Sequence, residues 1–314
     1  MATALALAER GRGRTAPNPN VGCLIVREGV VVGRGWTQPG GRPHAEAMAL
    51  TQAGEKSRGA TCYVTLEPCA HESVRGAACA PTLAAAGVAR VVAAIGDPDP
   101  RTAGKGFAQL RAAGIDVVEG VLADAARASM AGFLTQARLG RPFVTLKLAT
   151  SLDGCIARAD GESRWITGPQ ARAHGHLERA RHEAILVGRG TFAADGPRLD
   201  VRLAGLEHRS PRRLLLSRAC DAGGWERIDA PHAIAGLAGV DHLLVEGGSG
   251  AAAAFLRADL VDRLLLYRAP ILIGGGVAAL GDIGLGQLSD AHGRWRRTDR
   301  RQLGSDTLEV YERG

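Results

Sequence analysis

The 314-residue chain has few aromatic side chains and almost no lysine. Phe, Trp and Tyr make up 4% of the sequence, so Val, Leu, Ile and Ala must fill any core within a hydrophobic content of 46%. Lysine occurs only at Lys56, Lys105 and Lys147, and arginine supplies nearly all of the positive charge. We interpret this bias as compositional. A nucleic-acid surface requires a clustered basic face, preferably with exposed aromatics, whereas these arginines are scattered. The one dense run, RWRRTDRR at 294–301, is interpreted as a solvated surface segment.

Long apolar runs and a secretion signal are also missing. No run approaches the ~18 residues of a membrane span. The N-terminal MATALALAERGRGR has no basic region before its short apolar run, so it predicts an amphipathic helix. Six cysteines spread over such a chain indicate a cytoplasmic protein, in which paired cysteines more often serve metal binding or catalysis than disulfides. The net charge of +7 is compatible with anionic ligands such as phosphates.

The length predicts two domains, at roughly 150 residues per domain. The first third alternates strand and helix signals: a hairpin over 21–36, helices over 43–54, 79–88 and 106–115, and strands over 60–68, 90–98 and 116–121. This β-β-α-β-α-β-α-β order is typical of an α/β layered domain with a partly parallel sheet. A helix is expected over 122–142, and the boundary is placed at residue 140. A second α/β unit, 141–314, shows strand signals at 143–154, 183–188, 212–217, 242–248 and 262–274.

Cys69 and Cys79 are separated by nine residues and follow His44-Ala45-Glu46. A disulfide, a structural zinc or a catalytic zinc could each explain the pair. His44, Cys69 and Cys79 together would leave one tetrahedral position of a zinc ion open, as a catalytic zinc requires. A structural zinc would need a fourth ligand, for which His71 is the only obvious extra candidate in this segment.

Glu46 favours the catalytic interpretation. Zinc lowers the pKa of a bound water, and a nearby carboxylate can move a proton from that water to the substrate nitrogen and the departing amine. H-x-E followed by P-C-x-x-C is typical of zinc nucleobase deaminases. Here Pro68-Cys69 is present, but the second cysteine follows after nine residues instead of two. An isolated cysteine pair would favour a structural zinc or unrelated buried thiols, whereas the upstream His-Ala-Glu favours catalysis.

These motifs resemble the bifunctional deaminase–reductase family of riboflavin biosynthesis. That family has a long loop, PC-S/A-H-x-G-R-T-P-P-C, where this chain has PCAHESVRGAAC, one residue longer and without Thr-Pro-Pro. The stretches 16–26 and 96–106 also resemble the family. The resemblance implies a cytidine-deaminase-like three-layer domain in which His71, Arg75, Asn18 and Asn20 contact substrate. For the asparagines, ordinary turn chemistry is the alternative. Lys105 could meet a phosphate or lie on the surface.

From about Pro142 to Tyr311 the chain resembles the family's reductase domain, which is dihydrofolate-reductase-like and uses NADPH. LLVEGGSGAAAAFL at 243–256 reads as a strand, a Gly-rich turn and a helix start that can bind an anion, although it is not the G-x-G-x-x-G of a Rossmann domain. The resemblance assigns cofactor contacts to Ala149, Trp165, Thr167, Thr191, Asp195, Ser217, Gly247, Gly248, Ser249 and Gly250. It assigns substrate contacts to Lys147, Ser163, Arg179, Leu199, Arg202 and Glu246. Surface ion pairs are the alternative for the two arginines, and charge-assisted phosphate binding is their predicted role.

The resemblance therefore implies two steps: removal of the exocyclic amine from a diaminopyrimidinone ribosylamine phosphate, then NADPH reduction of the ribosyl chain. Lys147, Asp153 and Glu246 are candidates for the proton donor in the reduction. The remaining cysteines are expected in the core or as exposed bystanders: Cys23, Cys62, Cys155 and Cys220. Three histidines are expected on the surface of a helix: His174, His176 and His182. A homodimer is the default assembly. A nucleic-acid or nucleotide deaminase with an appended binding domain, and a zinc scaffold that has lost an activity, are the alternatives.

Overall fold

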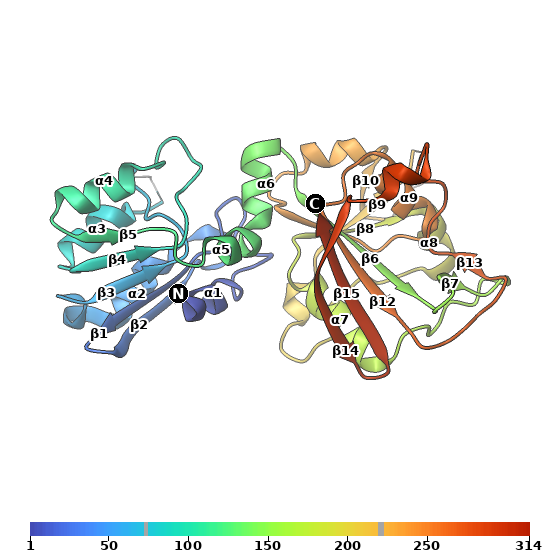
Figure 1. Ribbon diagram of the computed structural model, residues 1–314, viewed down its shortest axis with the longest axis horizontal. Helices are drawn as coiled ribbons and strands as arrows, with labels where there is room; N and C mark the ends of the chain where they lie inside the picture. The colour runs from blue at the N-terminus through green and yellow to red at the C-terminus, as the bar shows by residue number, and fades with distance from the viewer. Residues whose placement is uncertain (72–74, 219–222) are drawn as a thin grey trace. The chain divides into compact units, whose positions relative to one another are not determined.

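The computed structural model describes residues 1–71, 75–218 and 223–314. The chain divides into two compact units, Met1–Gly140 and Arg141–Gly314 (Figure 1). Each unit has its own hydrophobic core. None of the described helices is both long and apolar enough to cross a membrane.

The described part of unit 1 forms a five-stranded sheet in the order β2-β1-β3-β4-β5. Its elements are α1 (Ala2–Ala8), β1 (Gly22–Arg27), β2 (Val30–Trp36), α2 (Ala45–Ala53), β3 (Thr61–Val64), α3 (Cys79–Ala85), β4 (Arg90–Ala93), α4 (Lys105–Ala112), β5 (Asp116–Val118), α5 (Ala123–Ser129) and α6 (Ala131–Leu139). Strand β1 is antiparallel to β2 and β3, whereas β3, β4 and β5 are parallel. The predicted alternation and the partly parallel sheet are confirmed.

The prediction of one helix over 122–142 is wrong. Two helices, α5 and α6, meet at Met130, whose φ of −102° and ψ of 21° leave the helical region. The Met130 side chain is fully buried in the core of unit 1. The chain therefore turns at a residue that the core holds, and a helical hydrophobic pattern in the sequence does not reveal such a turn.

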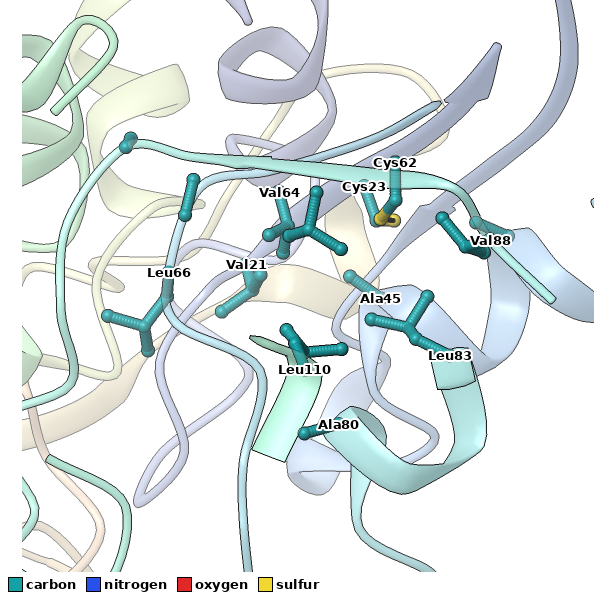
Figure 2. Close-up of a cluster of buried hydrophobic side chains, with 14 of the residues drawn as sticks. Val21, Cys23, Ala45, Cys62, Val64, Leu66, Ala80, Leu83, Val88 and Leu110 are labelled. Atoms are coloured by element: carbon teal, nitrogen blue, oxygen red, sulfur yellow. Dashed lines mark hydrogen bonds between the residues drawn. The ribbon is translucent and has the colours of Figure 1, made fainter. Parts of the chain in front are cut away.

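Close packing of α2 on the sheet determines where the His-Ala-Glu motif lies. A Cβ on Gly33 would lie 2.1 Å from the Ala49 carbonyl oxygen, and one on Gly35 would lie 2.0 Å from that of Ala45. Only glycines on β2 therefore allow the helix backbone to approach this closely. Figure 2 shows Ala45 within the cluster of buried side chains that also contains Val21. The close contact between β2 and α2 therefore fixes the first turn of α2 against the core.

Unit 2 contains a mixed sheet, eight-stranded over its described residues, in the order β10-β9-β8-β11-β6-β12-β15-β14. Its elements are β6 (Phe143–Thr150), β7 (Cys155–Ala157), α7 (Pro169–Arg179), β8 (Ala184–Gly188), α8 (Arg189–Asp195), β9 (Arg212–Leu216), β10 (Glu226–Ile228), β11 (His242–Val245), α9 (Ser249–Arg257), β12 (Arg263–Arg268), β13 (Val277–Ala278), β14 (Trp295–Leu303) and β15 (Asp306–Arg313). The strands from β10 to β12 run parallel, and β15 and β14 complete the sheet antiparallel.

Residues 295–301 of the basic run lie on β14, at the edge of this sheet. Most of its side chains are exposed, as expected for a solvated segment. Charged side chains on an edge strand oppose pairing with another chain. The strand itself was not predicted, because a run dominated by arginine carries no alternating hydrophobic pattern.

The expected helix surface for the three histidines is wrong for His182, which is 1% exposed. Its ring contacts the Glu178 carbonyl oxygen at 2.6 Å and the Thr145 hydroxyl at 3.2 Å. His174 and His176 are half-buried on α7. Free, buried thiols are found at Cys23, Cys62 and Cys155, as expected for core cysteines. The remaining cysteine, Cys220, lies outside the described residues.

Candidate active sites

The metal-ligand candidates of the sequence come together in unit 1. His44, Cys69 and Cys79 each offer one ligand atom, and these atoms all lie within 4.8 Å of one another. His44 caps the N-terminus of α2, and Cys79 is the first residue of α3. The Cys79 backbone N–H donates to the Cys69 sulfur at 3.3 Å. Two helix starts and the chain after β3 therefore converge on one point.

The donor set fits a zinc ion. Two thiolates and one imidazole are preferred zinc ligands, and three protein ligands leave a fourth position for a reacting molecule. Hydrogen bonds from Cys79 and His44 lower the pKa of the Cys69 thiol to about 4, although burial opposes this. A thiolate is thus available as a ligand at neutral pH.

Glu46 lies in the first turn of α2, is 4% exposed and contributes to the wall of a cavity of about 250 Å³. His44, Cys69, His71 and Arg75 line the same cavity. Burial raises the pKa of the Glu46 carboxyl, and the positive charge of His44 opposes that rise. A carboxyl group beside a metal-ligand cluster, but outside it, is placed to exchange protons with bound reactants.

The two asparagines of the 16–26 segment have different positions. Asn18 lines the cavity, and its amide nitrogen is placed 3.1 Å from Nε2 of His44. When Nδ1 of His44 binds a metal, Nε2 carries the proton, so the amide oxygen of Asn18 is the group that would accept it. Asn20 is absent from the cavity wall. It is buried, and its amide nitrogen donates to the Ser129 carbonyl oxygen at 3.3 Å, so Asn20 packs inside unit 1 and does not line the cavity.

Sequence reasoning missed several residues of this cavity. Arg42 lines it directly before Pro43-His44, and Asp97, Asp99 and Arg101 line it from the 96–106 stretch. Burial raises the pKa of the Asp97 carboxyl to about 6. The family-like sequence of 96–106 was the available signal, but it did not show which side chains face inward. Lys105 is outside the wall, and its ammonium donates to the Pro100 carbonyl oxygen.

A second cavity of about 1170 Å³ lies in unit 2. It gathers nearly all the residues assigned to the cofactor and to the reductase substrate: Lys147, Ala149, Ser163, Trp165, Thr167, Arg179, Thr191, Asp195, Leu199, Arg202, Glu246, Gly247, Gly248, Ser249 and Gly250. Ser217 is the exception. It is buried at the end of β9, next to Leu216, which does line the cavity.

A charge cluster lies in the wall of this cavity. The Arg179 guanidinium donates to both Glu246 oxygens, at 2.7 and 2.8 Å, and the Lys147 ammonium lies 3.7 Å from the same carboxylate. Burial alone would raise the pKa of Glu246, but Lys147 and Arg179 lower it to about 2. Glu246 is therefore ionised near neutral pH, which rules it out as the proton donor and leaves Lys147 as the remaining candidate in the cluster.

Asp153, the third proton-donor candidate, is absent from the described cavity wall. Its carboxylate accepts hydrogen bonds from the Ser151 hydroxyl and from the backbone N–H groups of Ile273 and Gly274. These bonds lower the pKa of Asp153 to about 2. Asp153 instead holds the chain after β12 in place, a role that the short Asp-Gly pattern did not reveal.

The Gly-rich turn before α9 packs tightly at the cavity. The Gly248 backbone N–H donates to the Thr191 hydroxyl at 2.8 Å. A Cβ on Gly247 would lie 2.5 Å from the Ala251 side chain. The turn therefore has no room for a side chain at Gly247. Residues Gly247, Gly248, Ser249 and Gly250 all line the cavity, at the start of a helix, where a phosphate-bearing cofactor can bind.

Known proteins resemble both units of the chain. Residues 1–95 match the cytidine and deoxycytidylate deaminase zinc-binding region, and residues 142–308 match the RibD C-terminal domain. Riboflavin biosynthesis protein RibD of Escherichia coli is 42% identical over 93% of this chain and 92% of its own length. The relative of the same name from Haemophilus influenzae is 39% identical over 99% of this chain and 96% of its own length.

The chain belongs to the RibD family. Solved structures of RibD proteins also superpose on this chain. Acinetobacter baumannii RibD, 35% identical, superposes with a TM-score of 0.89 over 100% of this chain and 97% of its own. The Thermotoga maritima diaminohydroxyphosphoribosylaminopyrimidine deaminase/5-amino-6-(5-phosphoribosylamino)uracil reductase, 32% identical, has a TM-score of 0.91 over the same shares of the two chains.

Membership of the RibD family confirms the predicted fold class, a cytidine-deaminase-like domain followed by a dihydrofolate-reductase-like domain. The chain is a two-activity enzyme of riboflavin biosynthesis, a zinc-dependent hydrolytic deaminase and an NADPH-dependent reductase. The alternative of a nucleic-acid or nucleotide deaminase with an appended binding domain is not favoured.

Proposed function

We propose that the cavity of unit 1 removes the exocyclic amine of a diaminopyrimidinone ribosylamine phosphate and that the cavity of unit 2 then reduces the ribosyl chain. Residues 1–140 would thus form the deaminase and 141–314 the reductase. The observation that carries the proposal is the convergence of His44, Cys69 and Cys79 on one point, with His44, Cys69 and Glu46 in the wall of one cavity. The name of the Thermotoga maritima relative supplies the substrate class.

In the deaminase, His44, Cys69 and Cys79 would hold the zinc ion. Bound zinc lowers the pKa of a water molecule, so that hydroxide is available near neutral pH. Glu46 would take one proton from that water and deliver it to a ring nitrogen of the substrate. It would then carry a second proton, from the hydroxyl group added to the ring carbon, to the departing amine, which leaves as ammonia. Asn18 fixes the orientation of the His44 ring. His71 and Arg75 line the same cavity and are assigned to substrate contacts.

In the reductase, the Gly247–Gly250 turn with Ala149, Thr167 and Thr191 would line the cofactor site. Bound NADPH supplies the hydride that reduces the sugar carbon C1. Lys147 donates a proton to the sugar oxygen as the ring opens, and the ion pair with Glu246 holds the Lys147 side chain in place. Arg202 is assigned to the substrate phosphate, because all three nitrogens of Arg179 are already engaged by Glu246 and the Asp200 carbonyl oxygen.

A mass spectrum of the product tests both steps. Purified, zinc-loaded protein is incubated with the diaminopyrimidinone ribosylamine phosphate, first without and then with NADPH. We expect replacement of an amine by oxygen in the first incubation and a gain of two hydrogens only when NADPH is present. No change in mass with zinc bound would contradict the proposal, and exchange without reduction would restrict it to the first domain.

A cytoplasmic location and a homodimer are also proposed. The free thiols of the described cysteines support the first. The second follows from the prevalence of twofold homo-oligomers. Light scattering coupled to gel filtration would measure the mass of the assembly, and a monomer at micromolar concentration would contradict the dimer.

A further inference from the structure

Glu67 is a buried acidic residue two positions before the metal-ligand candidate Cys69, and the mechanism does not use it. It is 2% exposed. Its two oxygens accept hydrogen bonds from three backbone N–H groups, those of Asp97 at 3.1 Å, Gly104 at 3.0 Å and Phe107 at 3.2 Å. An ionised carboxylate is buried only when such donors compensate its charge. All three donors come from one later segment, 97–107.

A second contact joins the same two segments. The Thr102 hydroxyl, fully buried, is 3.2 Å from Nδ1 of His71. The packing between the segments is also tight, because a Cβ on Gly106 would lie 2.0 Å from the Pro68 carbonyl oxygen. Segment 97–107 is therefore held against residues 67–71 along its length.

Segment 97–107 supplies part of the wall of the deaminase cavity, through Asp97, Asp99 and Arg101. None of these three belongs to the metal-ligand cluster. These three side chains can hold a substrate within reach of the metal site and Glu46 only if their distance from the metal-ligand candidates is fixed. Glu67, which also lines this cavity, connects the two, because it lies two residues before Cys69 and both of its oxygens are occupied by hydrogen bonds from the wall segment.

We propose that Glu67 is a positioning residue of the deaminase, which holds the substrate-contacting wall at a fixed place relative to Cys69, with Thr102 orienting His71 in the same way. The inference rests on the proposed deaminase function. A purely structural role for Glu67 would change the yield of folded, zinc-loaded protein. Positioning changes the KM of the folded enzyme.

The test uses full-length Glu67→Gln, with Glu119→Gln as a matched control. Glu119 is exposed in the same unit and pairs with Arg111. Glutamine preserves the size of Glu67 but replaces one accepting oxygen with an amide NH₂, so at least one backbone N–H loses its partner. We expect a rise of about tenfold in the deaminase KM for Glu67→Gln, a much smaller change in kcat and full zinc content.

Two readouts separate positioning from an effect on the metal ligands. The absorption spectrum of the cobalt-substituted protein, which reports on thiolate coordination, should match that of wild type. Hydrogen–deuterium exchange of the Asp97, Gly104 and Phe107 amides should become faster in Glu67→Gln and stay unchanged in Glu119→Gln. A folded, zinc-loaded Glu67→Gln with wild-type KM, or an altered cobalt spectrum with unchanged exchange, would overturn the proposal.

If Glu67→Gln does not fold, Thr102→Val provides the test of the proposal. It leaves Glu67 intact and removes the hydroxyl that contacts His71, so a raised deaminase KM supports the proposal and an unchanged KM overturns it. If wild type shows no deamination, the proposed function fails separately. Amide exchange then decides the inference: slow exchange in wild type that is lost in Glu67→Gln supports it, and fast exchange in wild type overturns it.

Discussion

The two cavities of the chain differ in how their charged groups are satisfied. In unit 1, three metal-ligating atoms lie within 4.8 Å of one another, an arrangement that a bound cation completes. In unit 2, the buried carboxylate of Glu246 already lies between two protein cations, Arg179 and Lys147. The first site therefore needs a metal to become chemically complete, whereas the second is balanced by its own side chains. Changes to one site should leave the other working.

The largest effect is expected from Glu46→Gln. The amide cannot transfer the proton, so deamination should fall by about a thousandfold, while the protein keeps its zinc and reduces a pre-deaminated substrate at the wild-type rate. Parallel assays of the two half-reactions and a zinc determination measure this. Loss of zinc would show that Glu46 is a ligand, and loss of reduction would show that the two sites do not work independently.

Glu246→Gln should act on the other site and on stability. Removal of the carboxylate leaves Arg179 and Lys147 without their partner, which should abolish most of the reduction and lower the free energy of unfolding by about 3 kcal/mol. Deamination should be unaffected. Denaturant unfolding and the two half-reaction assays measure these changes, and Glu312→Gln on β15 serves as a control.

The difference in the free energy of unfolding between wild type and Glu246→Gln should shrink as the pH falls. The pKa of Glu246 is lowered from 4.5 to about 2 in the folded protein, so the unfolded state binds more protons between these values. The stabilisation is therefore complete above pH 4.5 and is lost as pH falls toward 2. A difference between wild type and Glu246→Gln that grows on acidification would contradict the ion cluster.

Asn18→Ala tests how the metal site is supported. Without Asn18 the His44 ring loses the partner of its second nitrogen, and loss of such a partner weakens metal binding by about tenfold or more. Competition with a chelator measures the zinc affinity. Asn20→Ala is the matched control, because Asn20 lies outside the cavity wall. An equal loss of zinc affinity in both variants would indicate a general effect on the 16–26 segment.

The smallest effect is expected from Arg202→Ala. This side chain is partly exposed, and its removal should raise the KM of the reductase substrate by about fivefold, as the loss of one screened phosphate contact would. The KM of deamination should not change. Equal changes in both KM values would mean that the boundary near residue 140 does not separate the two activities.

The metal-ligand candidates could be found from sequence because their chemistry is local: His44 and Glu46 are two residues apart, and Pro68-Cys69 follows a strand signal. The strand and helix order was predictable for the same reason. Asn20 and Asp153 could not be placed correctly, because their partners, Ser129 and the backbone at 273–274, are distant in sequence. The role of Glu67 could not be found from sequence, because its hydrogen-bond donors lie about 30 to 40 residues later.

Removal and return of the metal tests whether the two sites work independently. Wild-type protein is stripped with a chelator, and deamination and the NADPH-dependent reduction of a pre-deaminated substrate are measured before stripping, after stripping and after zinc is restored. The account predicts that deamination disappears and returns with zinc, while the rate of reduction stays constant throughout. Loss of both activities together, or survival of deamination without metal, would contradict it.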